Sequence, residues 1–284
     1  MKAKTLSGKE VVAKLREDLA SRVAELGKKG IDPLLSIVVV GDAAPSQAYI
    51  RGIERACEAV GVTVQTGHFP PDTKQEDLEE HLAALNQDPA VHGVIVMQPL
   101  PAGFEEGKLA ALLRPEKDVD CFNPINAGRV MADDSLAFPP ATPQAVLEIL
   151  KYYDIPLEGR QAVVIGRSMV VGKPLSMLLL KENATVTICH SRTRDLAALC
   201  RQADLVVAAA GRPGLVTGEM VKPGAVVVDV GINFADGKMV GDVDFAGVSS
   251  VAGAVTPVPG GVGTVTSTVV VKHVVQAAER AAAG

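Results

Sequence analysis

The feature that most constrains the fold is a repeated alternation between short apolar runs and segments with helical spacing. The run Leu35–Val40, bounded by Pro33 and Gly41, is apolar almost throughout and predicts a buried strand. Helical spacing follows over Ser46–Val60, and the same alternation continues along the chain. Strands that alternate with helices favour a parallel sheet with helices on its faces. The predicted fold class is therefore α/β.

Two such series stand on either side of a proline-rich segment, Phe138–Pro143, which is interpreted either as a linker or as a shaped loop. The first predicts strands at Leu35–Val40, Val62–Thr66 and Val91–Met97, with helices at Ser46–Val60 and Lys74–Asn86. The second predicts strands at Ala162–Ile165, Thr185–Cys189, Asp204–Ala208 and Ala225–Val230, with helices at Gln144–Tyr153, Val171–Lys181 and Arg194–Arg201. A chain of 284 residues is long enough for two domains, which we expect at 1–140 and 141–284. The last helix, 265–282, is apolar enough to pack back on the first domain.

Composition excludes several classes of protein. Hydrophobic residues make up 48% of the chain and charged residues 21%, so an intrinsically disordered protein is not expected. The net charge is −5 and no basic tract stands out, so no nucleic-acid partner is expected. The apolar runs are far shorter than the roughly 20 residues of a membrane helix, so no membrane partner is expected either.

The cysteines and the first residues point to a cytoplasmic protein. The four cysteines, Cys57, Cys121, Cys189 and Cys200, form no CxxC pair. We expect reduced thiols that act as small buried hydrophobic residues, and no metal site. The opening residues lead into a polar helical pattern rather than into the apolar core of a signal peptide.

A glycine turn after the strand Ala162–Ile165 predicts a dinucleotide site. Gly166, Arg167 and Ser168 lie between this strand and the next helix. Such a turn lets backbone N–H groups approach a phosphate, and the N-terminus of the helix attracts the negative charge. Ser168 occupies the second glycine position of GxGxxG, so an ordinary tight turn remains the alternative.

The end of the following strand indicates the type of dinucleotide. NAD sites usually place Asp or Glu there, to bind the ribose 2′-hydroxyl. This chain has His190, Ser191 and Arg192 instead. A hydroxyl and a guanidinium, with Arg167 nearby, suit a 2′-phosphate, so the sequence predicts NADP. The alternatives are a solvated surface charge for Arg192 and a structural role for His190.

The segment Gly166–Pro174 resembles the GRSxxVGxP signature of the methylenetetrahydrofolate dehydrogenase/methenyltetrahydrofolate cyclohydrolase (FolD) family. Other segments resemble the family's ordered motifs over nearly the whole chain: Thr5–Lys9, Val40–Asp42, Ser46–Tyr49, Gly93–Pro101, Lys117–Asp120 and Pro257–Gly263. The resemblance implies an N-terminal three-layer α/β folate domain and a C-terminal Rossmann-like NADP domain, with a cleft between them. It also implies a homodimer.

The resemblance also implies roles for individual residues. Tyr49, Asp120, Pro259 and Gly260 would line the folate site, with Tyr49 and Asp120 taking part in catalysis. The NADP contacts would come from Gly166, Arg167, Ser168, Ser191 and Ile232, to which the strand-end argument adds Arg192. The simpler alternatives are a core ring for Tyr49, and a helix N-cap or a loop salt bridge for Asp120.

Several positions depart from the family pattern, among them Ile53, Met97 and Cys121. Ile53 stands where the family has its catalytic lysine, four residues after Tyr49. Met97 stands where the family has its catalytic glutamine, and Cys121 stands where the family usually has glycine. Replacing the lysine and the glutamine together exchanges a polar pair for an apolar pair and leaves no unpaired buried charge. The joint change is typical of a refitted site.

The departures affect the two reactions of the family differently. Hydride transfer to the nicotinamide needs aligned rings and no proton-transfer group, whereas ring opening by water needs a base and an acid. We therefore expect NADP-dependent oxidation of 5,10-methylenetetrahydrofolate to 5,10-methenyltetrahydrofolate in one-carbon metabolism, with cyclohydrolase activity lost or weak.

Two other functions stay open from the sequence. One is a fully bifunctional enzyme that uses Glu54, Tyr49 or water as a substitute. The other is a non-catalytic protein that binds folate or NADP. A related pterin carrier also stays open as the substrate.

Overall fold

The computed structural model describes residues 2–41, 44–235 and 237–283, and the chain divides into two compact units. The six-stranded unit consists of Met1–Val12 and Thr142–Thr266, and the three-stranded unit consists of Ala13–Ala141 and Ser267–Gly284. The division falls inside two long helices, α1 (Gly8–Lys28) and α10 (Val262–Ala283). The expected first domain, 1–140, thus differs from the structure at its start, because the first twelve residues belong to the six-stranded unit.

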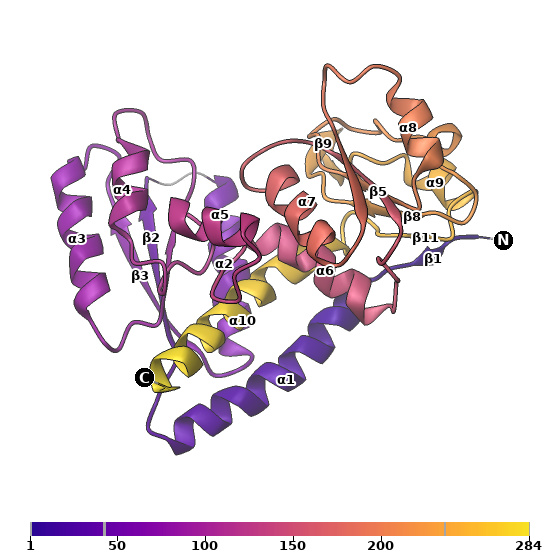
Figure 1. Cartoon of the computed structure of the whole chain (residues 1–284). Coiled ribbons are helices and arrows are strands. Elements are labelled where there is room, and N and C mark those ends of the chain that lie inside the picture. Colours follow the sequence, from indigo (N-terminus) through magenta and orange to yellow (C-terminus); the bar gives the residue numbers. More distant parts are fainter. Residues whose placement is uncertain (1, 42–43, 236, 284) are drawn as a thin grey trace. The chain divides into compact units, whose positions relative to one another are not determined.

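The three-stranded unit is a parallel α/β sheet. Its strands are β2 (Leu34–Val40), β3 (Thr63–Phe69) and β4 (Gly93–Val96), in the order β3-β2-β4. Its shorter helices are α2 (Ala44–Glu58), α3 (Gln75–Gln87), α4 (Glu106–Leu112) and α5 (Pro124–Met131). Figure 1 shows α3 and α2 on opposite sides of the sheet. The predicted parallel pairing is confirmed for this half of the chain.

Both faces of this sheet are buried at β2 and β4, whereas the edge strand β3 is partly exposed, and this explains the continuous apolar run of β2. Val38 and Val40 of β2 pack on one face with Leu78 of α3, in one hydrophobic cluster. On β4, a Cβ atom added to Gly93 would lie 2.8 Å from a methyl carbon of Val274 in α10. The backbone of β4 therefore approaches α10 too closely for any side chain larger than hydrogen.

The six-stranded unit contains the second α/β series. Its strands are β1 (Lys4–Thr5), β5 (Gln161–Ile165), β6 (Thr185–Cys189), β7 (Leu205–Ala208), β8 (Val226–Asp229) and β11 (Ala254–Val255), all parallel, in the order β1-β11-β8-β7-β5-β6. Its helices are α6 (Ala141–Tyr152), α7 (Gly172–Lys181), α8 (Leu196–Gln202) and α9 (Phe245–Ser249), with a 3-10 turn at Gly218–Met220. Strands β9 (Asn233–Ala235) and β10 (Lys238–Val240) form an antiparallel hairpin.

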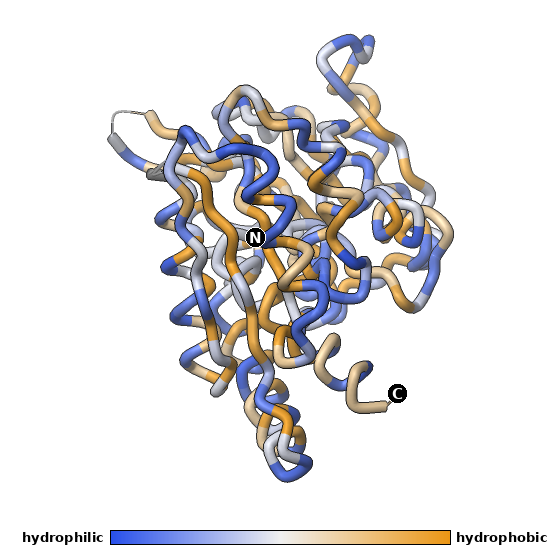
Figure 2. Tube along the Cα trace, turned by 90° about the vertical axis from the view of Figure 1, so that its left-hand side faces the viewer, coloured by the Kyte–Doolittle hydropathy of each residue, from blue (hydrophilic) through white to orange (hydrophobic). Residues whose placement is uncertain are grey.

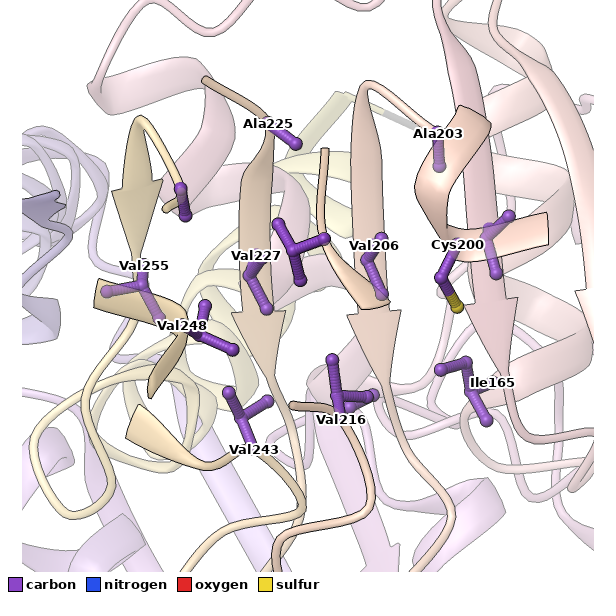
Figure 3. Packing of buried hydrophobic residues seen from close by; sticks show 14 of the residues in the cluster. Ile165, Cys200, Ala203, Val206, Val216, Ala225, Val227, Val243, Val248 and Val255 are labelled. Carbon is purple, nitrogen blue, oxygen red and sulfur yellow. The ribbon is translucent and has the colours of Figure 1, made fainter. Parts of the chain in front are cut away.

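Small β-branched side chains fill the core of the six-stranded unit. Val206 of β7 and Val227 of β8 lie side by side on one face of the sheet, with Val248 of α9 and Cys200 of α8 in the same cluster (Figure 3). Three of the four cysteines, Cys57, Cys189 and Cys200, are buried as the sequence predicts, whereas Cys121 is only half-buried. Burial raises the pKa of Cys57 to about 12 and that of Cys200 to about 11, so these thiols stay protonated.

The described ranges contain no group of three or more His, Cys, Asp or Glu residues that could hold a metal ion. Among the helices in those ranges, none is long and apolar enough to cross a membrane. Figure 2 shows hydrophilic and hydrophobic residues alternating along the coiled segments, as expected for helices with one buried face.

The proline-rich segment after residue 137 is not a linker, contrary to one interpretation of the sequence. Helix α6 begins at Ala141, and Phe138 is fully buried. The Phe138 ring lies 5.4 Å from the ring of His273 and 4.4 Å from the guanidinium carbon of Arg280. The prolines therefore shape a packed turn inside the three-stranded unit.

The close approach at Gly93 yields a stability prediction. Gly93→Ala forces its new methyl group against Val119 and Val274, so it should lower the free energy of unfolding by roughly 1–3 kcal/mol. Gly128 lies exposed within α5 with open space around it. Gly128→Ala should raise the free energy of unfolding by about 0.5–1 kcal/mol. Urea unfolding of both variants checks this, and equal effects would contradict the packing at Gly93.

Candidate functional site

The turn after β5 has a backbone that only glycine allows. Gly166 has φ +140°, and a Cβ atom there would collide with the carbonyl oxygen of Ala209, at the end of β7. A Cβ atom on Gly172 would collide with the carbonyl oxygen of Gly166. The turn therefore packs tightly against the end of β7 and the start of α7, with its backbone free of side chains at both glycines.

A cavity of about 440 Å³ lies beside this turn. It is lined by Ile165, Gly166, Arg167, Ser168, His190, Ser191, Thr193, Leu196, Ala209, Ala210, Arg212 and Leu215. The Ser168 hydroxyl accepts a hydrogen bond from the Val171 N–H at 3.1 Å, just before α7 begins. A glycine turn, the N-terminus of a ten-residue helix and two arginines beside one cavity fit a dinucleotide with its phosphates.

The residues expected to contact NADP around this turn are only partly brought together. Arg167, Ser168 and Ser191 line the cavity, and Arg192 does not. Arg192 is exposed, and its backbone N–H donates to Nδ1 of His190 at 3.1 Å. Sequence reasoning missed Arg212, although its place directly after an apolar strand and a glycine was the available signal.

A second cavity, of about 240 Å³, lies at the ends of β8 and β11. It is lined by Asp229, Val230, Gly231, Ile232, Met239 and the segment Pro257–Thr264. Ile232 is 59% exposed there, and Gly260 has φ +103°. The Gly260 carbonyl accepts the Gly8 N–H at 2.8 Å, so the start of α1 anchors this loop. The structure thus brings Ile232, Pro259 and Gly260 to one cavity.

In the three-stranded unit, Tyr49 and Ile53 occupy successive turns of α2. Tyr49 is half-buried, whereas Ile53 is fully buried. Met97 follows β4 and is 7% exposed, with its N–H donating to the Val38 carbonyl at 2.8 Å. Ile53 and Met97 are therefore packed apolar groups. Asp42, in the segment Val40–Asp42 of the family resemblance, lies outside the described residues.

Asp120 is a half-buried acid at the start of α6. Its Oδ1 accepts the Ala141 N–H at 2.8 Å, so the helix-capping role considered from the sequence is part of what it does. Burial, with a contribution from Asp118, raises the pKa of Asp120 to about 7, although the Ala141 N–H opposes this rise. Burial and the nearby Asp120 carboxylate hold the pKa of Tyr49 well above 10. Asp120 and Tyr49 thus share one poorly hydrated environment.

A hydrogen-bonded turn built on Asp118 positions Asp120. The buried Asp118 carboxylate accepts the N–H groups of Phe122, at 2.8 Å, and Asn123, at 2.9 Å. Burial raises the pKa of Asp118. Cys121, between Asp120 and Phe122, has φ +61°. This backbone conformation suits glycine, which the family pattern usually has at this position.

His273 of α10 contacts the same turn, and sequence reasoning missed this residue. Its Nδ1 lies 2.9 Å from the Val119 carbonyl oxygen, one residue before Asp120. His273 is 3% exposed and lies in the apolar tail helix. A lone histidine in such a helix was the available signal.

Comparison with known proteins gives consistent matches along the chain. The family model described as tetrahydrofolate dehydrogenase/cyclohydrolase, catalytic domain, matches residues 6–120. The model for the NAD(P)-binding domain of the same family matches residues 140–282. A curated relative from Carboxydothermus hydrogenoformans, named bifunctional protein FolD, is 50% identical over 280 residues, which is 98% of each chain.

Solved structures agree with these matches. The bifunctional FolD enzyme from Campylobacter jejuni has a TM-score of 0.95 and 41% identity, covering 98% of this chain and 99% of that one. The FolD enzyme from Trypanosoma brucei, solved with an NADP cofactor and an inhibitor, has a TM-score of 0.94 and 36% identity, covering all of both chains.

The raised pKa of Asp120 predicts a pH-dependent stability difference. The folded-state pKa lies above the unfolded value of about 4, so the wild-type chain loses stability as the pH rises from 4 through 7. Asp120→Asn removes this loss while keeping an acceptor for Ala141. The free energy of unfolding of Asp120→Asn, relative to that of the wild type, should therefore rise by roughly 1–4 kcal/mol between pH 4 and pH 8. Denaturant unfolding across this range checks the prediction.

Asp32→Asn, at an exposed aspartate, is the matched control for loss of a negative charge. Parallel stability curves for wild type and Asp120→Asn would show that Asp120 ionises like a surface carboxylate.

Proposed function

Because the chain belongs to the tetrahydrofolate dehydrogenase/cyclohydrolase family, we propose that it oxidises 5,10-methylenetetrahydrofolate to 5,10-methenyltetrahydrofolate with NADP and does not open the ring afterwards. The observation that carries this proposal is that Ile53, one turn after Tyr49 on α2, and Met97, directly after β4, are both buried apolar residues in a chain that has a dinucleotide cavity. On this proposal the chain carries out one of the two reactions for which its family is named.

Residues of the six-stranded unit support the cofactor part of the proposal. Bound NADP supplies a hydride acceptor at its nicotinamide ring. The turn at Gly166 and the start of α7 offer backbone N–H groups and a helix dipole to the phosphates. Arg167 and Ser191, on the lining of the cavity, offer a guanidinium and a hydroxyl to a 2′-phosphate.

Tyr49 and Asp120 support the folate part. A phenol with a pKa well above 10 stays protonated at neutral pH and can donate or accept a hydrogen bond. Asp120, held by the turn on Asp118, offers a carboxyl oxygen to the polar edge of a pterin ring. In the family pattern, Pro259 and Gly260, which line the cavity of about 240 Å³, are further substrate-binding residues.

Hydride transfer and ring opening make different demands on these residues. Hydride transfer needs orientation of two rings, which binding contacts provide. Ring opening needs proton transfer, which typically contributes about 10²–10⁴-fold to the rate. The side chains of Ile53 and Met97 carry no exchangeable proton, and both are buried.

A second candidate is the bifunctional enzyme, and one observation favours it. Asp120 has a pKa of about 7, which suits a general base near neutral pH. In that case Asp120 would activate the water that opens the ring. Glu54, exposed on α2, and Tyr49, with its high pKa, are weaker substitutes.

The decisive experiment follows both reactions with one sample. With 5,10-methylenetetrahydrofolate and NADP, we expect NADPH to form at a steady rate. With 5,10-methenyltetrahydrofolate alone, we expect its absorbance to decay at the rate of the buffer blank. Decay well above the blank would favour the bifunctional enzyme, and Asp120→Asn would then return it to the blank. Absence of NADPH formation would favour a non-catalytic binding protein.

A gain-of-function variant sharpens this experiment. Ile53→Lys with Met97→Gln restores the family pair, and the rate of methenyl decay should rise at least ten-fold over the parent. Ile53→Met with Met97→Leu is the matched control, because it changes the same positions without adding a polar group. A rise in the control as well would assign the effect to altered packing.

Cofactor choice gives a separate prediction. Arg167 lines the dinucleotide cavity and Arg192 does not, so Arg167→Gln should weaken NADP binding by about ten-fold or more and leave NAD binding nearly unchanged. Arg192→Gln should change NADP binding less. Titration calorimetry with each dinucleotide measures this, and the reverse order would place the 2′-phosphate at Arg192.

The resemblance also supports a homodimer and a cytoplasmic location. These stay predictions, as does the absence of nucleic-acid and membrane partners. Light scattering after size-exclusion chromatography measures the mass in solution.

A further inference from the structure

Two buried carboxylates, Asp229 and Asp242, lie at the ends of strands in the six-stranded unit, and the proposed chemistry does not use them. Asp229 ends β8 and is 3% exposed. Asp242 follows the β9–β10 hairpin and is fully buried. Burying two carboxylates so close together costs free energy unless donors surround them.

Asp242 is surrounded by donors from two loops. Its Oδ2 accepts the N–H groups of Ala210, at 2.6 Å, and Gly211, at 2.9 Å. Its Oδ1 accepts the Arg212 N–H at 2.8 Å and the side-chain amide of Asn233 at 2.9 Å. The Oδ1 atom of Asp242 thus links Arg212, in the loop after β7, to Asn233, the first residue of β9.

Asp229 holds Asp242 in place. Its Oδ1 accepts the N–H groups of Gly231 and of Asp242, each at 2.9 Å, and its Oδ2 accepts the Val243 N–H at 3.0 Å. A Cβ atom on Gly241 would collide with the Asp229 carboxylate, so the chain packs directly on it. The two acids and the segments 210–212, 231–233 and 241–243 form one hydrogen-bonded network.

This hydrogen-bonded network forms part of the walls of both cavities. Ala210 and Arg212 line the 440 Å³ cavity, while Gly231 and Ile232 line the 240 Å³ cavity. Ile232 is flanked by Gly231 and Asn233, whose donors are both held by the acids. The position of Ile232 is therefore set from both sides.

The same hydrogen bonds restrict where phosphates can bind. The three successive N–H groups at 210–212 would otherwise suit an anion, but Asp242 already occupies them. Phosphates are left with the turn at Gly166 and the start of α7. In a fold of this kind the adenosine ribose lies at the end of the second strand, here β6 with Ser191, so the other half of the dinucleotide extends toward β7 and β8.

We propose that Asp242, supported by Asp229, is a positioning residue for the nicotinamide half of the cofactor, because its hydrogen bond to Asn233 fixes the segment 231–233 beside the 240 Å³ cavity. This inference rests on the proposed use of NADP. Asp242 also holds residues 210–212 of the 440 Å³ cavity, so its own effect is larger on the nicotinamide half than on the adenosine half, whereas Asn233 acts on the nicotinamide half alone.

The experiment compares the whole dinucleotide with its adenosine half. Titration calorimetry measures the dissociation constants of NADP and of adenosine 2′,5′-bisphosphate for wild type, Asp242→Asn and Asn233→Ala. Asp242→Asn places an amide against backbone donors, and Asn233→Ala removes only the donor from the Ile232 loop. Asn233→Ala should weaken NADP binding about ten-fold or more and leave the bisphosphate within two-fold. Asp242→Asn also loosens residues 210–212 of the 440 Å³ cavity, so it should weaken both ligands, and NADP at least five-fold more than the bisphosphate.

The control is Asp244→Asn, two residues away. Asp244 is exposed and caps α9 by accepting the Gly247 N–H, and it lines neither cavity. This variant should bind both ligands like wild type. If Asp242→Asn does not fold, Asn233→Ala carries the test, since it leaves both carboxylates and their backbone donors unchanged.

The other outcomes each overturn a defined claim. Equal weakening of NADP and the bisphosphate would reduce Asp242 to a general structural role. Unchanged NADP binding in both variants would remove the positioning role altogether. A wild type that binds the bisphosphate but not NADP, or neither ligand, would refute the proposed use of NADP itself.

Discussion

Buried carboxylates that accept backbone N–H groups are the interaction on which both functional edges depend. Parallel strands deliver their loops to one edge of a sheet, where the ladder no longer satisfies the backbone donors. Asp118 fills this need in the three-stranded unit, and Asp229 with Asp242 fills it in the six-stranded unit. Each acid is buried by the loops that it holds, so the loops and the acids stabilise one another.

The burial of carboxylates also affects the chemistry of Tyr49 and Asp120, the residues expected to bind folate. Burial raises the pKa of Asp118 and of Asp120, and a buried lysine nearby would oppose that rise. Ile53 supplies no such charge. The acid is therefore held near the middle of its titration at neutral pH, while the tyrosine beside it stays a phenol. A cation at position 53, where the family pattern has lysine, would thus change the proton balance of these residues as well as the shape of the site.

Much of the fold could be predicted from the sequence, for a physical reason. Strands buried on both faces, such as β2, need continuous apolar residues, and this pattern is visible without any neighbour. The short strand β1 has no such pattern, since its residues are exposed and its position comes only from pairing with β11. The boundary error at the start of the chain follows from this. The turn at 138–140 was interpreted from its prolines, whereas the burial of Phe138 depends on helix α10, more than a hundred residues later.

The candidate site was predictable where a local motif carries the chemistry, as at Gly166 and Ser191, and not where distant segments meet. Asp242 reaches back to residues 210–212, and His273 reaches back to Val119, across 154 positions of the chain. Arg192 shows the opposite case. Its type and its distance from Gly166 suit a phosphate, but the turn after β6 leaves its side chain off the cavity lining. Local spacing specifies which residues are near a strand end but not the direction of each side chain.

The division of the chain also bears on how the protein can be made. Each unit is assembled from two separate stretches, and β1, at residues 4–5, pairs with β11 at 254–255. During synthesis on the ribosome, residues 4–5 therefore cannot pair in the sheet until residues 254–255 have emerged, about 250 residues later. The three-stranded unit waits longer still for its share of α10. Neither unit corresponds to a continuous stretch of the gene, so neither could be exchanged between relatives by a single crossover.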